Sequence, residues 1–171
     1  MYTDDLLIMV DITIKDKESI KVNYLSKDEI IKSGIEFIGE VCYSGEYGEQ
    51  VYTKELDEGG IPVEGILYER YENGNIIYYE FCKDGIPNGI QVWFYHNGNI
   101  KSYCVMDGGT IDGEYIEWYE NGEVKIRKNC KYGLVLTMQE FDESGRLVNE
   151  KKELLDYEKN IYEKYSGKVY N

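Results

Sequence analysis

Few residues in this chain of 171 have the type and spacing that catalysis or metal binding requires. The single histidine, His96, stands just before an Asn-Gly pair, and its equivalents in two similar segments are Glu72 and Glu120. A lone histidine lacks the partners of a general base or a metal ligand, so we expect His96 to be a solvated turn residue. The phosphate-binding pattern GxxxxGK[ST] does not occur.

The cysteines form no close-spaced pair of the kind that binds zinc. They are Cys42, Cys82, Cys104 and Cys130. We expect four reduced, mostly buried thiols, no metal site and no cofactor. Some carboxylates must lie close together by chance, but a glycosidase pair requires a cleft, which a thin ribbon of strands barely offers. The sequence therefore predicts no catalytic residue and a protein that is not an enzyme.

Acidic residues dominate the chain, 33 against 19 basic ones, for a net charge of −14. Clustered Lys and Arg, which nucleic-acid binding needs, are missing, and attraction to an anionic membrane is disfavoured for the same reason. Half of the net charge lies in residues 39–74, which hold 9 acids and 2 bases. This segment is either a solvated, solubilising surface or a docking patch for a basic protein. The candidate patch comprises Tyr43, Glu46, Tyr47, Glu49, Glu55, Asp57, Glu58 and Glu69.

A repeat must position these residues. Three segments align without gaps, each opening and closing on a glycine and each 24 residues after the last: 65–74, 89–98 and 113–122. A degraded copy precedes them from Gly39, and another follows from Leu136, with Ser-Gly in place of Asn-Gly. Atypical outer units are typical of a stacked array that caps itself. The predicted divisions are an N-terminal cap (1–38), five units (39–64, 65–88, 89–112, 113–135 and 136–149) and a C-terminal cap (150–171).

Each unit has the pattern of a β-hairpin. Asn-Gly favours a two-residue type I′ turn, and the flanks are rich in residues that suit a pleated sheet. The predicted turns are Asn73-Gly74, Asn97-Gly98 and Asn121-Gly122, with Tyr71 facing Ile76, Tyr95 facing Ile100 and Tyr119 facing Val124. Gly85 and Gly89 are expected in the reverse turns. The predicted fold is mainly β: an elongated antiparallel meander of about ten strands.

Alternation along the strands divides the side chains between two faces. The more apolar face, our choice for the packed side, carries Ile66, Tyr68, Arg70, Ile90, Val92, Phe94, Ile116, Trp118 and Phe141. The other mixes aromatic residues with carboxylates, as expected of a half-wet contact surface. It carries Leu67, Glu69, Tyr71, Gln91, Trp93, Tyr95, Tyr115, Glu117 and Tyr119. A one-residue error in register would exchange the faces.

The two ends differ from the repeats. Residues 6–14 and 20–25 alternate and predict a hairpin, and Ser26 to Glu29 form a capping box that opens a short helix ending at Gly34. Residues 150–165 have helical periodicity, and we expect this helix to cover an exposed strand edge. The acidic first residues do not resemble a secretory signal, so a cytoplasmic location is expected.

The phrases WFYHNGNIK (93–101), YERYENGNI (68–76) and IEWYENGEVK (116–125) resemble the MORN-repeat variant family, whose bacterial YwqK-type members are regarded as antitoxins or immunity proteins of toxin systems. The resemblance covers residues 39–149. It implies a hairpin ribbon for protein contact without catalytic residues, because such a motif specifies architecture better than function.

The resemblance implies an immunity protein that binds a cognate toxin one to one. A basic, nuclease- or deaminase-like toxin fits the charge, because an acidic inhibitor can occlude a cationic active face. The alternatives are a scaffold module at a membrane or in a complex, as other MORN proteins are thought to be, and a wall-glycan or choline binder. Whether the chain is a monomer or an edge-paired dimer stays open.

Overall fold

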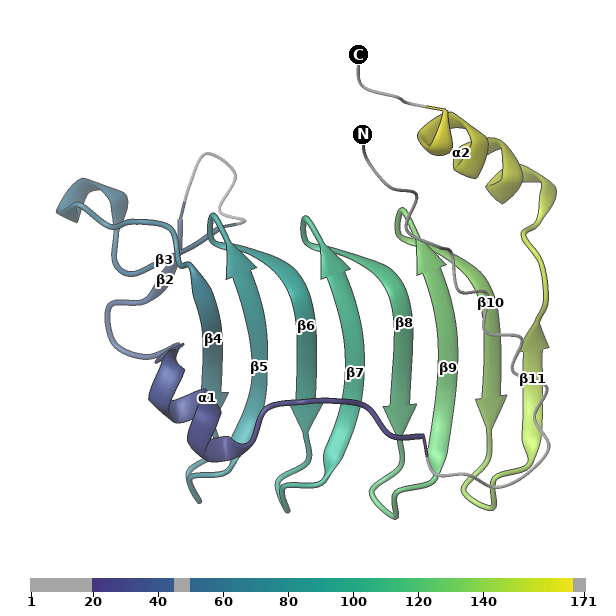
Figure 1. Cartoon of the computed structure of the whole chain (residues 1–171), viewed down its shortest axis with the longest axis horizontal. Helices are drawn as coiled ribbons and strands as arrows, with labels where there is room; N and C mark the ends of the chain where they lie inside the picture. Colours follow the sequence, from purple (N-terminus) through teal and green to yellow (C-terminus); the bar gives the residue numbers. More distant parts are fainter. Residues whose placement is uncertain (1–19, 45–49, 168–171) are drawn as a thin grey trace, which may run out of the picture.

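The computed structural model describes residues 20–44 and 50–167 of the chain. Nine strands form one sheet, and from β4 to β11 neighbours in the chain pair antiparallel (Figure 1). In sheet order the strands are β1 (Gly34–Glu36), β4 (Gly65–Arg70), β5 (Ile76–Lys83), β6 (Ile86–Phe94), β7 (Ile100–Asp107), β8 (Thr110–Trp118), β9 (Val124–Lys131), β10 (Leu134–Phe141) and β11 (Leu147–Lys151). The predicted antiparallel meander is confirmed, with the short β1 added parallel to β4 at one edge.

The first unit does not extend this sheet as a further hairpin, contrary to the prediction of five stacked units. Its strands β2 (Cys42–Ser44) and β3 (Gln50–Tyr52) form a separate two-stranded sheet, followed by the 3-10 helix η1 (Leu56–Glu58). Backbone bonds from Val51 N to Gly85 O (2.8 Å) and from Gly85 N to Val63 O (2.9 Å) fasten it to the β5–β6 turn. Val51 and Val63 bury against Leu67 and Cys82, and this burial favours folding back over stacking.

The Asn-Gly loops differ from the predicted two-residue turns. Tyr71 N donates to Asn75 O and Gly74 N donates to Tyr71 O, both at 2.8 Å. Gly74 has φ +80°, whereas Asn73 is not left-handed. This is the three-residue loop with a left-handed glycine. Strand pairing begins at Arg70 and Ile76 in this hairpin, at Phe94 and Ile100 in the next, and at Trp118 and Val124 in the third. The predicted pairs Tyr71–Ile76, Tyr95–Ile100 and Tyr119–Val124 are therefore wrong by one residue.

Turns with two left-handed central residues lie at the opposite ends of the strands. Asp84 and Gly85 have φ +53° and +72° between the paired residues Lys83 and Ile86. Gly108-Gly109 and Tyr132-Gly133 repeat the arrangement. Gly85 is thus in a reverse turn as predicted, but Gly89 lies within β6 with φ +116°. The prediction for Gly89 was wrong because a strand can also use a left-handed glycine where its pairing is irregular.

Tyrosine hydroxyls couple each hairpin to the next. Tyr71 donates to Phe94 O at 3.0 Å, Tyr95 to Trp118 O at 2.7 Å, and Tyr119 to Phe141 O at 3.0 Å. Within the described residues no hairpin follows the last unit. Its equivalent residue is Asp142, whose carboxylate accepts from the backbone of its own loop. The outermost repeat therefore has an aspartate in place of the tyrosine, at the position where no carbonyl of a next hairpin accepts from a hydroxyl.

The face that the apolar alternation predicted to be packed is buried, and it packs against the N-terminal segment. We call it the helix face; its buried side chains include Tyr68, Tyr79, Val92 and Phe94, which enclose Ile30 of helix α1 (Lys27–Ser33). Figure 1 shows residues 20–26 crossing in front of the strands to reach α1. We call the opposite face, which carries Glu80, Gln91 and Cys104, the open face. The first unit covers its β4–β5 end around Leu67.

The two caps differ in how well they were predicted. The capping box of Ser26 and Glu29 and the helix end at Gly34 are confirmed. Residues 20–25, predicted as a strand, are described but form none, and residues 6–14 lie outside the described residues. The C-terminal helix α2 (Asp156–Ser166) is present, but Tyr162 contacts Tyr132 in the β9–β10 turn with ring centroids 5.7 Å apart. Helix α2 lies at this end of the sheet (Figure 1), so it does not cover the β11 edge as expected.

Candidate functional site

The open face brings together several of the predicted contact residues. Strand register places Glu69 opposite Tyr78, Tyr78 opposite Trp93, Trp93 opposite Ser102 and Ser102 opposite Glu117. A second row runs from Leu67 through Glu80, Gln91 and Cys104 to Tyr115. Because opposite side chains on one face lie about 5 Å apart, Glu69, Trp93, Tyr115 and Glu117 share one continuous surface.

An aromatic pair lies at the centre of this surface. The rings of Tyr78 and Trp93 stack with centroids 4.7 Å apart and planes 27° from parallel. Tyr78 is buried and Trp93 is half-buried. Sequence reasoning missed Tyr78, because the irregular pairing between Glu69 and Arg70 changes which residues of β5 face which side. A bulge of this kind leaves only a weak signal in the alternation of residues.

Glu80 is a buried carboxylate beside the aromatic pair. It is 6% exposed, and burial raises its pKa although hydrogen bonds from Gln91 and Cys82 lower it. The bond from Gln91 Nε2 measures 2.6 Å. Neither Glu80 nor Glu69 forms an ion pair with a Lys or Arg of residues 20–44 or 50–167. This part of the open face therefore carries carboxyl groups that no cation of the described residues compensates.

The β7–β9 part of the open face carries its own cations. Lys125 Nζ pairs with Glu117 at 2.7 Å, and Lys128 Nζ lies 4.9 Å from the centre of the Tyr115 ring. Burial raises the pKa of Glu117, but the bonds from Lys125 and Tyr115 outweigh it and the pKa is lowered. The rings of Tyr95 and Tyr119 lie below Lys101 and Lys125. The predicted tyrosines here already have intramolecular partners.

The acidic residues predicted as one patch do not all meet. Glu55, Asp57 and Glu58 are exposed at η1 on the first unit, at the end of the sheet (Figure 1). Glu64 accepts a hydrogen bond from Asp84 N at 2.7 Å, so this carboxylate stabilises the β5–β6 turn. Glu46, Tyr47 and Glu49 lie outside the described residues.

Tyr43 connects the first unit with the open face. It is 60% exposed, and its ring centroid lies 5.4 Å from that of Phe37. Burial of its hydroxyl raises the pKa of Tyr43, and the charges of Glu80 and Glu69 add to the effect. Tyr43 is therefore close to the uncompensated carboxylates, unlike the acids of η1.

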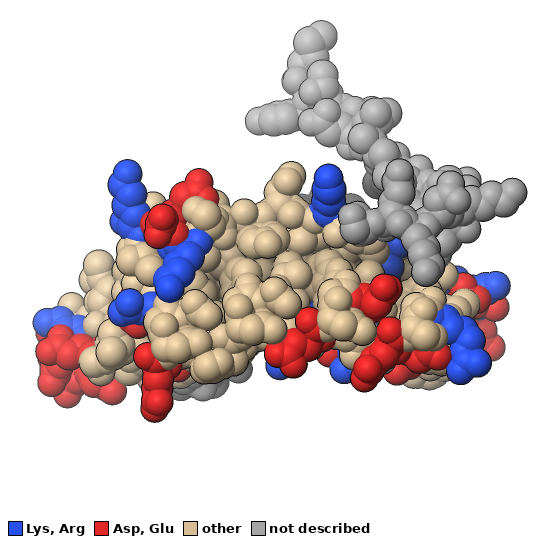
Figure 2. Space-filling view, turned by 90° about the horizontal axis from the view of Figure 1, so that it is seen from below, with Lys and Arg blue, Asp and Glu red and all other residues tan. Residues whose placement is uncertain are grey.

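The rim formed by the Asn-Gly loops is a ladder of amides rather than a site of chemistry. Asn73 Nδ2 donates to His96 O at 3.1 Å and Asn97 Nδ2 to Glu120 Oε1 at 3.0 Å, while Asn121 Nδ2 donates to Glu143 O. His96 is exposed, as expected, and its ring contacts that of Tyr71. Figure 2 shows acidic side chains on this side separated by uncharged surface. The asparagines thus hold neighbouring loops together.

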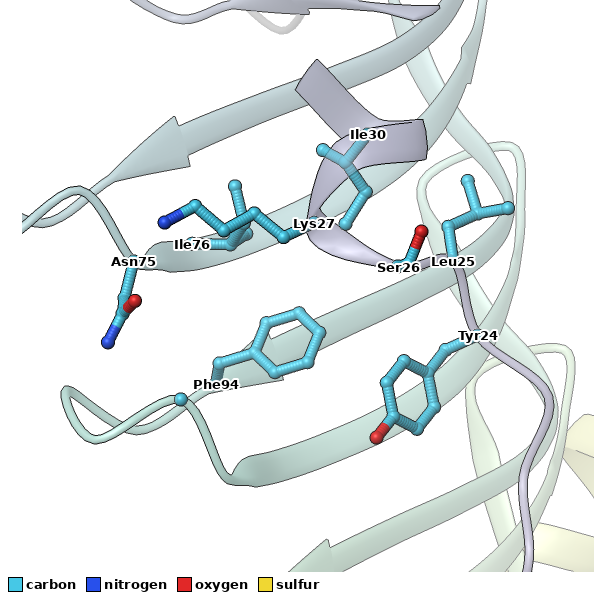
Figure 3. Close-up of a pocket in the computed structure, with 9 residues that line it drawn as sticks. Tyr24, Leu25, Ser26, Lys27, Ile30, Asn75, Ile76 and Phe94 are labelled. Carbon is cyan, nitrogen blue, oxygen red and sulfur yellow. The ribbon is translucent and has the colours of Figure 1, made fainter. Parts of the chain in front are cut away.

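A pocket of about 200 Å³ opens on the helix face near this rim. Figure 3 shows Tyr24, Leu25 and Ile30 on one side of it and Ile76 and Phe94 on the other. The residues that the structure describes contain no His, Cys, Asp or Glu cluster able to hold a metal. They also contain no helix long and apolar enough to cross a membrane.

Comparison with known proteins agrees with this repeat architecture. Residues 87–106 and 111–130 match the family model of the MORN repeat variant, which confirms the resemblance over these two segments. The chain is also 32% identical over 67 residues to the immunity protein YwqK of Bacillus subtilis (strain 168). That match covers 39% of this chain and spans about two fifths (42%) of the relative. No solved structure matches the chain significantly.

Proposed function

We propose that the chain is an immunity protein that binds a cognate bacterial toxin one to one and neutralises it without catalysis. The observation that carries the proposal is the 32% identity over 67 residues to the immunity protein YwqK. The partner is a basic, nuclease- or deaminase-like toxin domain, whose active face is occluded in the cytoplasm of the producing cell.

The surface and the charge of the chain support this proposal. The open face presents Trp93 and Tyr115 on a rigid sheet whose hairpins are hydrogen-bonded to each other. Half-exposed aromatic anchors supply most of the affinity in protein interfaces. The net charge of −14 steers a cationic partner and raises the rate of association.

The experiment asks whether this chain neutralises the protein that the neighbouring gene encodes. Cells that express that protein are expected to survive only when this chain is co-expressed, and the purified pair is expected to elute as a 1:1 complex. The association rate should fall as salt rises, because screening weakens long-range attraction. Survival unchanged by this chain, or no complex, contradicts the proposal.

A second candidate follows from the MORN repeats alone: a non-enzymatic scaffold module for protein or membrane association. The match to the repeat variant favours it equally, whereas the net charge of −14 opposes binding to anionic lipid. Sedimentation with phosphatidylserine vesicles distinguishes the two. Co-sedimentation at physiological salt supports the scaffold, and recovery in the supernatant supports the immunity protein.

A further inference from the structure

The β4–β6 part of the open face lacks cations of its own. The described residues that its strands direct to this face include two carboxylates, Glu69 and Glu80, and no Lys or Arg. The neighbouring β7–β9 part is different, because Lys125 and Lys128 lie over its tyrosines and Lys125 pairs with Glu117. The two halves of one repeated surface thus differ in whether their aromatic rings already have a cation.

The geometry of this part suits a planar cation. Trp93 is half-buried and stacked on Tyr78, and Glu69 is the cross-strand neighbour of Tyr78. A guanidinium stacks on aromatic faces and binds carboxylates through two parallel hydrogen bonds, whereas an ammonium is a compact, strongly hydrated charge. Glu69 is half-buried, and no donor of the described residues bonds its carboxylate, so its oxygens can accept from a ligand.

We propose that the Trp93–Tyr78 pair together with Glu69 is the anchor point for an arginine side chain of the partner protein. This deepens the proposed function and rests on it for the identity of the partner. The arginine side chain lies across the outer edges of the stacked Trp93 and Tyr78 rings, and its guanidinium pairs with the Glu69 carboxylate beside Tyr78. The buried carboxyl of Glu80 lies on the same face, on the strand that carries Tyr78.

The test uses the full chain and two short probes of equal charge, tetra-arginine and tetra-lysine peptides. Binding is followed by tryptophan fluorescence. The chain has two tryptophans, and Trp118 is buried on the helix face at 4% exposure, so Trp93 gives the response. We expect tetra-arginine to bind about fivefold more tightly than tetra-lysine, in line with the strength of cation–π contacts.

Two variants with a matched control locate the site. Glu69→Gln is expected to weaken tetra-arginine binding about fivefold and to abolish the preference over tetra-lysine. Glu72→Gln removes the same charge from an exposed loop position three residues away and should leave the preference intact. Trp93→Ala, followed by a dye displaced from the peptide, should also abolish it. Thermal unfolding of each variant verifies that the sheet is folded, and Trp93→Phe should retain a reduced preference.

The outcomes separate this inference from the proposed function. Equal affinity for the two peptides, or equal effects of Glu69→Gln and Glu72→Gln, overturns the arginine anchor. If Glu69→Gln and Trp93→Ala bind the toxin as the unmodified chain does, the anchor is wrong while the immunity function stands. If no toxin is neutralised but tetra-arginine selects Trp93 and Glu69, the anchor stands while the immunity function is wrong.

Discussion

Glu80 illustrates how burial on one face of a sheet changes the pKa of a side chain. Its carboxylate is buried next to Tyr78 and Cys82, and it accepts a hydrogen bond from Gln91. Burial is the main cause of its raised pKa. The same burial raises the pKa of the Cys82 thiol to about 12 and raises that of Tyr78, so both remain uncharged at neutral pH.

Glu80→Gln is expected to change how stability depends on pH. A carboxyl whose pKa is raised by folding contributes stability below its unfolded pKa, and this contribution is lost as pH rises through the folded pKa. Glutamine can keep an oxygen for Gln91 and carries no charge to desolvate. The variant should therefore unfold at a higher temperature than the unmodified chain at pH 7.5, with the difference shrinking towards pH 4.

Thermal unfolding between pH 4 and 8 measures this difference, with Glu72→Gln as the control at an exposed loop position. A constant offset between Glu80→Gln and the unmodified chain across the pH range contradicts the expectation. So does an offset that grows on acidification.

At the scale of elements, Gly85 holds two parts of the molecule together. It occupies a left-handed turn position with φ +72°, and its backbone bonds to both Val51 and Val63. A Cβ built there comes within 2.5 Å of Val51 O, a backbone atom that cannot move alone. At Gly122, φ is +88° and no atom lies within 4 Å of such a Cβ.

This contrast predicts different costs for the same substitution. In Gly122→Ala the only cost is that alanine must adopt a left-handed backbone conformation. This variant should lower the free energy of unfolding by about 1–2 kcal/mol. Gly85→Ala adds a clash with the first unit and should lower it by clearly more. Urea unfolding gives the free energies, and hydrogen exchange of residues 50–64 should accelerate only in Gly85→Ala. Equal losses for the two variants would show that the first unit is not fastened at this turn.

At the scale of the whole molecule, negative charge is concentrated on the first unit, whereas lysines offset the carboxylates of β7–β9. The first unit carries Glu55, Asp57 and Glu58 on the exposed η1. The lysines of β9 are balanced by local carboxylates such as Glu117 and Asp112. If the partner is cationic, long-range attraction should therefore be strongest at the end of the sheet that carries the first unit.

Reversing that charge tests where the partner approaches. The triple variant Glu55→Lys, Asp57→Lys and Glu58→Lys should slow toxin association several-fold at low salt, with little change in the dissociation rate. A control with the same change of net charge reverses the exposed residues Glu123, Glu143 and Glu153. Stopped-flow kinetics at two salt concentrations compare them. Equal slowing by both triples means that only net charge matters, and an unchanged rate means that the η1 acids only solubilise the chain.

The sequence by itself determined the parts of the fold that depend on neighbours in the chain. The 24-residue spacing determined the hairpins from Gly65 to Lys151, and alternation determined that Val92 and Ile116 face the packed side. The capping box determined helix α1. Most of the face carrying Glu69, Trp93, Tyr115 and Glu117 followed from the same alternation. Each of these signals is local, because backbone periodicity and capping act over a few residues.

The tertiary structure alone decided the features that depend on contacts between distant residues or on one-residue choices of geometry. Asn-Gly serves both two-residue and three-residue loops, so the pairing of Tyr71, Tyr95 and Tyr119 could not be predicted from the dipeptide. The stacking of Tyr78 on Trp93 depends on bulges in the pairing of β4 to β6. The first unit folds back because Val51 and Val63 pack against Leu67. These outcomes are decided by burial between segments far apart in sequence, which no local pattern encodes.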